Sequence, residues 1–261
     1  MPLNEELIKE ITIKLLRAEA DVKPIEALTT TYPDITIEDA RKINLNILSE
    51  RVRRGEKVIG FKVAFTSKAM QQSWGVSRPE WGFLTSGMLV PDGGEVDSKK
   101  LIQPRIEPEI AFLLGEDVRG PGISVADILK ATKGVLPAIE IVDTRLVGKR
   151  KVEDFIADSS GAARVVLGGI ISCVSGLDLR LIGCVVEING EVVATSAGAA
   201  ALGNPVNSMV FLANALAEVG EYLRAGQVVI TGSLVTAIPV KAGDYVKVSF
   251  DRIGSVSVKF V

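Results

Sequence analysis

The sequence predicts an α+β protein in which a β-rich core carries helices at its periphery and a helical segment at its N-terminus. Apolar residues recur at helical spacing mainly near the N-terminus. From residue 57 onwards, most apolar stretches are short and rich in β-branched residues, as in strands. No Gly-x-Gly-x-x-Gly sequence opens a helix after a strand and no Walker loop occurs, so neither common nucleotide-binding α/β fold is supported.

Residues 1–55 are predicted to form the helical segment. Between residues 3 and 20, apolar side chains recur at helical spacing among charged ones, which is typical of an amphipathic helix. A second helix is predicted over residues 36–53, because Thr36 followed by two acidic residues is a typical N-terminal signal and Gly55 can end the helix. Residues 56–261 are predicted to form a β-rich catalytic core, and the two parts to make one structural unit.

Strand patterns dominate after Gly55. The predicted strands are 57–66, 106–114, 135–142, 162–167, 182–187, 191–195, 228–231, 245–250 and 255–261. The pair Asn189-Gly190, between two of these strands, is typical of a two-residue hairpin. Further helices are predicted at residues 67–74, 125–133 and 205–219, and the last can be capped by Asn204.

The composition limits the partners and the chemistry. The chain has 261 residues with 30 basic and 32 acidic side chains, and the basic residues are interspersed with acids, which does not favour binding of nucleic acid. The start is unlike a signal peptide and no run of about 18 apolar residues occurs, so we predict no membrane segment and a cytoplasmic protein. The chain has no histidine, so catalysis must rely on carboxylates, lysine, hydroxyls or a hard metal ion.

Three acidic residues lie in predicted strands. Alternation places Glu107 and Glu109, with Arg105, on one face of their strand. Pro108 cannot donate a hydrogen bond to a sheet, which predicts an edge strand or a bulge where a site can open to solvent. Glu140 interrupts an apolar strand, where a charge requires a partner or a metal. Three carboxylates without histidine favour Mg²⁺ or Mn²⁺. An exposed strand face with Glu–Arg ion pairs explains these residues equally well.

Lys62 is the only charged residue between Gly60 and Thr66, in an otherwise apolar strand. Burial would lower the pKa of Lys62 and make the amine available for proton transfer or Schiff-base chemistry. Alternatively, the side chain extends to the rim of the sheet. The stretch 231–233, Thr-Gly-Ser, can present hydroxyls and backbone N–H groups to an anionic substrate, or form a plain turn.

Several ordered motifs point to a known family. They are residues 32–36 (YPDIT), 61–69 (FKVAFTSKA), 104–111 (PRIEPEIA), 137–145 (PAIEIVDTR) and 254–261 (GSVSVKFV). With these motifs the chain resembles the fumarylacetoacetate hydrolase superfamily over nearly its whole length, specifically the branch of 2-oxopent-4-enoate hydratases and 4-oxalocrotonate decarboxylases. The resemblance implies a fumarylacetoacetate-hydrolase-like core of mixed strands.

The resemblance also implies the parts of a site. Glu107, Glu109 and Glu140 would hold Mg²⁺ or Mn²⁺, and Lys62 would be the catalytic residue beside a planar 2-oxo or 2-hydroxy dienoic acid. The hydroxyl residues expected to contact the substrate are Thr66, Ser67, Ser86, Ser160, Thr231 and Ser233. Two of them depart from the family pattern: Ser86 stands in place of an aspartate, and Ser160 lies in a shorter run than the usual Asp-Asn-Ala-Ser.

The branch contains two reactions, and the residues favour one of them. Decarboxylation of 4-oxalocrotonate (2-oxohex-3-enedioate) to 2-hydroxypenta-2,4-dienoate needs mainly an electron sink. Hydration of that dienoate to 4-hydroxy-2-oxopentanoate needs an acid/base group, for which Ser86 is a poor replacement. We therefore expect a carboxy-lyase of the meta-cleavage catabolism of aromatic compounds; the alternatives are the hydratase and a non-catalytic homologue that binds an oxo acid. The resemblance further implies a homo-oligomer or a complex with the consecutive pathway enzyme.

Overall fold

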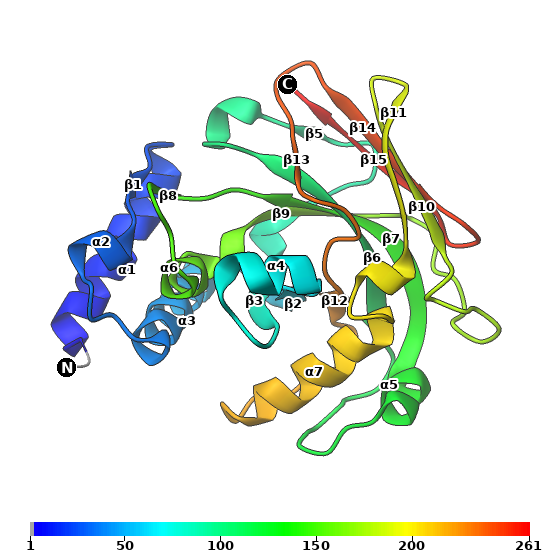
Figure 1. Cartoon of the computed structure of the whole chain (residues 1–261), viewed down its shortest axis with the longest axis horizontal. Helices are drawn as coiled ribbons and strands as arrows, with labels where there is room; N and C mark the ends of the chain where they lie inside the picture. Colours follow the sequence, from blue (N-terminus) through cyan, green and yellow to red (C-terminus); the bar gives the residue numbers. More distant parts are fainter. Residues whose placement is uncertain (1–2) are drawn as a thin grey trace.

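The computed structural model describes residues 3–261 and builds the chain from β-sheets with helices at the periphery (Figure 1). The strands are β1 Ile25–Glu26, β2 Val58–Ala64, β3 Glu80–Thr85, β4 Leu89–Val90, β5 Glu95–Val96, β6 Arg105–Leu114, β7 Thr132–Val142, β8 Leu146–Val147, β9 Ala162–Leu167, β10 Gly183–Ile188, β11 Glu191–Ala197, β12 Val228–Ile230, β13 Ile238–Pro239, β14 Tyr245–Phe250 and β15 Gly254–Phe260. An eight-stranded sheet has the order β3-β2-β12-β6-β7-β9-β4, with β13 paired to β6. A five-stranded sheet has the order β11-β10-β14-β15-β5. Parallel and antiparallel pairs occur in both, so the predicted mixed core is confirmed.

The α-helices are α1 Glu5–Ala20, α2 Leu28–Thr31, α3 Ile37–Arg53, α4 Lys68–Trp74, α5 Val125–Ala131, α6 Val152–Ala157 and α7 Pro205–Ala217. In Figure 1, α1, α2, α3 and α6 lie to the left of the sheets, α5 and α7 lie below them, and α4 lies near the centre of the view. The single-turn 3₁₀ helices are η1 Ser86–Met88, η2 Ser98–Lys100, η3 Ser159–Gly161 and η4 Gly198–Ala200. The predicted caps are present: Thr36 and Asp39 form a capping box, and Asn204 accepts the Val206 N–H.

Apolar packing joins these elements in more than one cluster. The larger cluster connects the two sheets and α7, through residues such as Phe112, Val246 and Leu212, each completely buried. A second cluster connects α1, α3 and α6, through residues such as Ile11 and Ile156. Burial of each such side chain contributes roughly 1.5–3 kcal/mol. The division of the chain after residue 55 stays a prediction.

The strand predictions are confirmed where the hydrophobic pattern is strong. Asn189 and Gly190 form the two-residue turn between β10 and β11, with φ of 55° and 84° as a primed turn requires. Strand β3 was not predicted, because Glu80 and Gly82 break its apolar pattern although all six of its residues are buried. The helix predicted to reach residue 133 ends at Ala131, where the chain enters β7.

Strand β6 lies inside the eight-stranded sheet, so the prediction that Pro108 marks an edge strand is wrong. On one side β6 pairs with β7 along its whole length. On the other side its partner is divided, because β12 pairs with residues 111–113 and β13 with residues 105–106. The carbonyl of Pro108 faces this interruption and accepts the Leu234 N–H at 3.0 Å. A proline is tolerated here because its missing donor faces the side where the ladder is broken.

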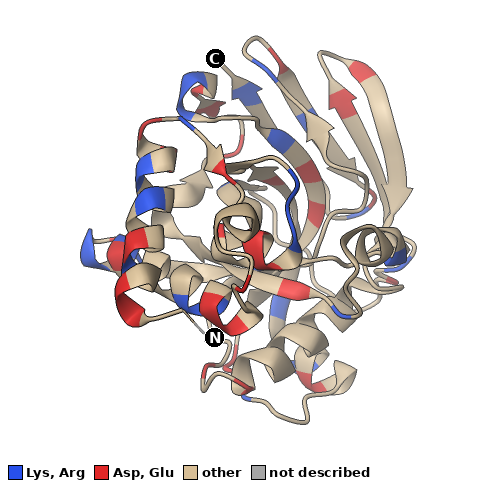
Figure 2. Ribbon diagram, turned by 60° about the vertical axis from the view of Figure 1, so that its left-hand side comes forward, with Lys and Arg blue, Asp and Glu red and all other residues tan. Residues whose placement is uncertain are grey.

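Charged residues are distributed over all parts of the fold. Figure 2 shows Lys and Arg mixed with Asp and Glu along the helices and the strands, without a large area of one sign in that view. Within residues 3–261, no helix combines the length and the apolar character that crossing a bilayer requires.

Candidate active site

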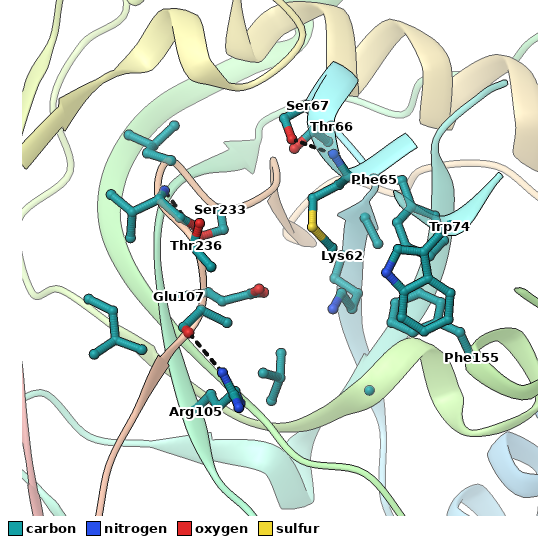
Figure 3. Close-up of a pocket in the computed structure, with 18 of the residues that line it drawn as sticks. Lys62, Phe65, Thr66, Ser67, Trp74, Arg105, Glu107, Phe155, Ser233 and Thr236 are labelled. Carbon is teal, nitrogen blue, oxygen red and sulfur yellow. Dashed lines mark hydrogen bonds between the residues drawn. The ribbon is translucent and has the colours of Figure 1, made fainter. Parts of the chain in front are cut away.

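A cavity of about 960 Å³ opens beside β2 and β6, and segments far apart in the sequence line it. The cavity is lined by all of residues 233–238, by Trp74, and by parts of residues 62–70, 103–107, 142–161 and 193–200. In Figure 3, Lys62 and Glu107 point toward one another across the cavity, whereas Trp74 and Phe155 lie beyond Lys62 as an aromatic wall. The ring centroids of Phe65 and Phe155 are 4.6 Å apart within this wall. One wall is therefore charged and the neighbouring one is apolar.

The structure brings the three predicted glutamates together. Glu107 and Glu109 lie on the same face of β6, and the register of β7 places Glu140 directly opposite Glu107. One carboxylate oxygen from each residue lies within 4.8 Å of the others. Glu109 and Glu140 are completely buried, and Glu107 is half-buried and lines the cavity. We call this group the carboxylate triad; its burial disagrees with the alternative of an exposed strand face.

The carboxylate triad fits a divalent cation. Among the described residues, Glu109 Oε1 and Glu140 Oε2 are buried without a hydrogen-bond partner, and Glu140 Oε1 has an ammonium nearby at an angle unsuited to a hydrogen bond. Burial raises the pKa of Glu107 to about 7, and burial together with the charges of Glu140 and Glu107 raises the pKa of Glu109. Buried carboxylate oxygens without donors are costly unless a cation balances them, and an all-oxygen set suits a hard ion.

Lys62 is the cation already present beside the carboxylate triad. Its side chain is only 2% exposed, which excludes the alternative of a lysine extending to the rim. Nζ lies 2.8 Å from Glu140 Oε1 and donates a hydrogen bond to the Ser160 carbonyl at 2.9 Å. Burial by itself would lower the pKa of Lys62, as predicted, but the charges of Glu140, Glu107 and Glu109 outweigh burial and raise the pKa. The amine is therefore held as an ammonium, which does not suit Schiff-base chemistry.

The predicted hydroxyl residues divide into three groups. Thr66, Ser67 and Ser233 line the cavity. Ser160 and Thr231 are completely buried, and their hydroxyls donate to backbone carbonyls of Trp81 and Ile110. Ser86 is exposed and is not among the residues that line the cavity; its hydroxyl accepts the Lys57 N–H at 3.0 Å. The structure thus does not bring Ser86 to the site.

The sequence analysis missed the aromatic wall and the helix that carries part of it. Phe155 lies in α6, a helix of six residues that was not predicted. The available signal was an acidic first turn, in which Asp154 accepts the Lys151 N–H, followed by apolar Phe155 and Ile156. Arg150 was also missed: it lines the cavity with its guanidinium 5.9 Å from the ring centre of Trp74.

Comparisons with known proteins agree with this geometry. The chain is 40% identical over 260 residues to 4-oxalocrotonate decarboxylase of Pseudomonas sp. (strain CF600), covering 99% of this chain and 98% of the relative. It is 43% identical over 220 residues to 2-hydroxypent-2,4-dienoate hydratase of Pseudomonas putida, covering 84% of this chain and 99% of the relative. The solved structure of 4-oxalocrotonate decarboxylase from Pseudomonas putida G7, complexed with magnesium and adipate, superposes with a TM-score of 0.96 at 38% identity and covers 99% of both chains.

A family model agrees with these relatives. The model described as fumarylacetoacetate (FAA) hydrolase C-terminal matches residues 57–261, which include β2, β6 and β7 with Lys62 and the carboxylate triad. The matched part is well over half of the chain, and the similarity to the decarboxylase extends through the N-terminal helices as well. The chain therefore belongs to the fumarylacetoacetate hydrolase family.

Proposed function

We propose that this protein is a divalent-metal-dependent lyase that decarboxylates 4-oxalocrotonate to 2-hydroxypenta-2,4-dienoate. The observation that carries the proposal is the carboxylate triad with the Lys62 ammonium beside it at one wall of the cavity. Similarity to 4-oxalocrotonate decarboxylases over 99% of the chain supports the choice of substrate.

The carboxylate triad would hold Mg²⁺ or Mn²⁺ through oxygens that have no other donor. Magnesium is the ion in the solved structure of the similar decarboxylase, which supports this choice. When bound, the cation would supply a Lewis acid at the place where negative charge develops on the substrate. Glu107 faces the cavity, whereas Glu109 and Glu140 lie deeper, so the substrate would approach from the side of Glu107.

Lys62 would act on the C2 oxygen of the substrate. Decarboxylation breaks the C5–C6 bond, CO₂ leaves from C6, and the electron pair moves through the C3–C4 double bond to the C2 oxygen. That oxygen then takes up one proton to become the 2-hydroxyl of the product. The Lys62 ammonium has three N–H donors; the Ser160 carbonyl accepts one of them and Glu140 lies beside it as an ion pair, so donor capacity remains for the substrate. The same ammonium can therefore stabilise the developing charge and donate the proton.

Hydration of 2-hydroxypenta-2,4-dienoate is the second candidate, because the chain is 43% identical to a hydratase over 220 residues. Addition of water needs a free acid/base group. Apart from Glu107, the carboxylates that line the cavity are Asp143, Asp154 and Asp158, and each already accepts hydrogen bonds from the protein. The donors are the N–H groups of Ile102 and Gln103 to Asp143, Thr29 and the Lys151 N–H to Asp154, and Arg145 and Thr144 to Asp158. This arrangement favours decarboxylation.

A product assay tests the proposal. We expect purified protein with Mg²⁺ to release one CO₂ per 4-oxalocrotonate and to form the dienoate, and EDTA to abolish the reaction by removing the Lewis acid. CO₂ and the dienoate absorbance are measured together. Formation of 4-hydroxy-2-oxopentanoate from the dienoate without CO₂ release would assign the hydratase instead. Thermal stabilisation by 4-oxalocrotonate, without turnover of 4-oxalocrotonate or of the dienoate, would indicate a non-catalytic binder.

The thermal stabilisation that Mg²⁺ gives should increase as the pH rises from about 5.5 to about 8. In the metal-free protein the pKa of Glu107 is about 7, above its ordinary value of 4.5, and the pKa of Glu109 is raised as well. At pH values between the ordinary pKa of 4.5 and the folded-state pKa of about 7, the folded state binds more protons than the unfolded state. The free energy of unfolding of the metal-free protein therefore decreases as the pH rises. Mg²⁺ binds only the ionised carboxylates and compensates this loss. Melting temperatures with Mg²⁺ and with EDTA measure the difference, and a difference that shrank at high pH would contradict the assignment.

We also expect a cytoplasmic location and assembly into a homo-oligomer or a complex with the consecutive pathway enzyme. The relatives named above are bacterial enzymes, which supports a cytoplasmic location. The small-molecule partner would be a 2-oxo or 2-hydroxy dienoic acid. Self-association and a complex with the consecutive pathway enzyme stay predictions from the resemblance, and mass measurement in solution tests both.

A further inference from the structure

The backbone acceptor of Lys62 lies in a strained turn. Ser159 and Ser160, in η3, both have φ of 53°, so two consecutive residues with side chains adopt the left-handed conformation. The Ser160 carbonyl accepts the Lys62 ammonium at 2.9 Å, and the Ser160 hydroxyl donates to the Trp81 carbonyl at 3.0 Å. Such a conformation persists only when its surroundings impose it.

A buried ion pair between Arg145 and Asp158 holds the Ser159–Ser160 turn in this conformation. Arg145 and Asp158 have side chains 5% and 4% exposed and form a charged hydrogen bond through Nε and Oδ1. The same guanidinium donates through Nη2 to the carbonyl of Asp158 and through Nη1 to the carbonyl of Ala162. One planar group therefore bonds the backbone on both sides of residues 159–161. Asp158 in turn accepts the Arg145 N–H at 3.0 Å, which closes the arrangement.

A gain in stability does not by itself explain why Arg145 and Asp158 form a buried ion pair. Burying two charges has a desolvation cost that the attraction between them only partly returns, and apolar residues of similar volume are often as stable. What an apolar pair cannot do is fix two carbonyl groups on either side of a turn, because this requires several donors in a rigid plane. The charged pair is therefore explained by the geometry of the turn that it fixes and not by a gain in stability.

We infer that Arg145 and Asp158 are positioning residues, which hold the Ser159–Ser160 turn so that its carbonyl fixes the Lys62 ammonium against Glu140 and toward the cavity. This inference rests on the proposed function, in which Lys62 acts on the substrate. Without the pair, the turn relaxes to an ordinary conformation and the Ser160 carbonyl moves away from Lys62. The ammonium then lies in several orientations, and catalysis loses the fraction of molecules in which it is correctly placed.

Three variants separate positioning from folding: Asp158→Asn, Arg145→Met, and the double variant Arg145→Met/Asp158→Leu. Each should lower kcat by about 10- to 100-fold, with KM and the Mg²⁺ dissociation constant changed by less than about threefold. The single variant Arg145→Met leaves an unpaired buried charge and should melt at a lower temperature. The double variant should recover the melting temperature and not recover kcat. Arg51→Met is the matched control, since it removes a partly buried ion pair with Glu19 and should leave kcat unchanged.

A second measurement does not depend on the reaction. In protein labelled with ¹⁵N-lysine, the buried Lys62 ammonium should give a slowly exchanging resonance, assigned by its loss in Lys62→Met. The resonance should shift or broaden in the three variants and stay in place in Arg51→Met. If it does so while the wild-type protein fails to decarboxylate, the proposed function is wrong and the positioning role stands. An unchanged resonance, or a double variant with wild-type kcat, would overturn the inference.

Discussion

Replacing Lys62 by methionine should lower kcat for decarboxylation by about 10³-fold, in a protein that still folds and still binds Mg²⁺. Methionine has a similar length and suits the apolar surroundings of β2, so packing is retained. The substitution removes the ammonium that contacts Glu140 and lines the cavity. The C2 oxygen of the substrate then lacks both a hydrogen-bond donor and a proton donor. Steady-state kinetics with saturating Mg²⁺ measures the effect.

The matched control is Lys57→Met, because Lys57 is exposed just before the same strand and should keep wild-type kcat. Melting temperatures with Mg²⁺ check that both variants are folded. The measurement should be made with the ion present, because Glu140 in the metal-free variant would be left with no cation beside it. Activity of Lys62→Met within about threefold of wild type would remove Lys62 from the mechanism.

The second large effect concerns Glu109. Changing Glu109 to glutamine should weaken Mg²⁺ binding by about 100-fold or more and, at the same time, raise the melting temperature of the metal-free protein by a few degrees. The amide keeps an oxygen to accept the Gly232 N–H, which lies 2.5 Å from Oε2 in the present structure. It removes one of three converging negative charges, two of them completely buried. Function and stability therefore change in opposite directions at one residue.

Glu80→Gln provides the contrast. Glu80 is also buried, but its carboxylate is paired with Arg41 rather than with other acids. Its replacement should lower the melting temperature and leave the Mg²⁺ dissociation constant unchanged, because the partly buried guanidinium of Arg41 loses its partner. Calorimetry measures binding, and thermal unfolding with EDTA measures stability. If Glu109→Gln lowered the melting temperature as Glu80→Gln does, the carboxylate triad would be an ordinary network of polar contacts.

Local patterns predicted much of the fold, and pairing between distant strands determined the rest. The hairpin at Asn189-Gly190 follows from two residues whose preferred φ values match the turn. The convergence of Glu140 on Glu107 depends on the register of β7 against β6, which no local pattern contains. The pKa of Lys62 illustrates the same limit, because the apolar pattern of β2 left burial and extension to the rim both open, and the charges that outweigh burial come from other strands.

Individual hydroxyls were the hardest to place. Ser86 directly follows β3 and Ser233 lies just beyond β12, and of the two only Ser233 lines the cavity. The difference arises because η1 turns Ser86 outward to accept the Lys57 N–H, whereas the chain between β12 and β13 passes along β6. The three-residue helix η1 determines the direction of the Ser86 side chain, and the residue types of η1 do not predict its geometry.

The alternation along β6 ties the proposed ion site to the register of the strand. Glu107 and Glu109 lie on the face of β6 that forms the carboxylate triad with Glu140, while Ile106 and Ile110 on the opposite face belong to the large apolar cluster. A slip of a single residue against β7 would exchange the two sets, moving both acids into the apolar interior and leaving Glu140 alone. A misaligned chain would therefore be less stable for two reasons, because its charges would be buried among apolar residues and because the proposed ion site would be lost.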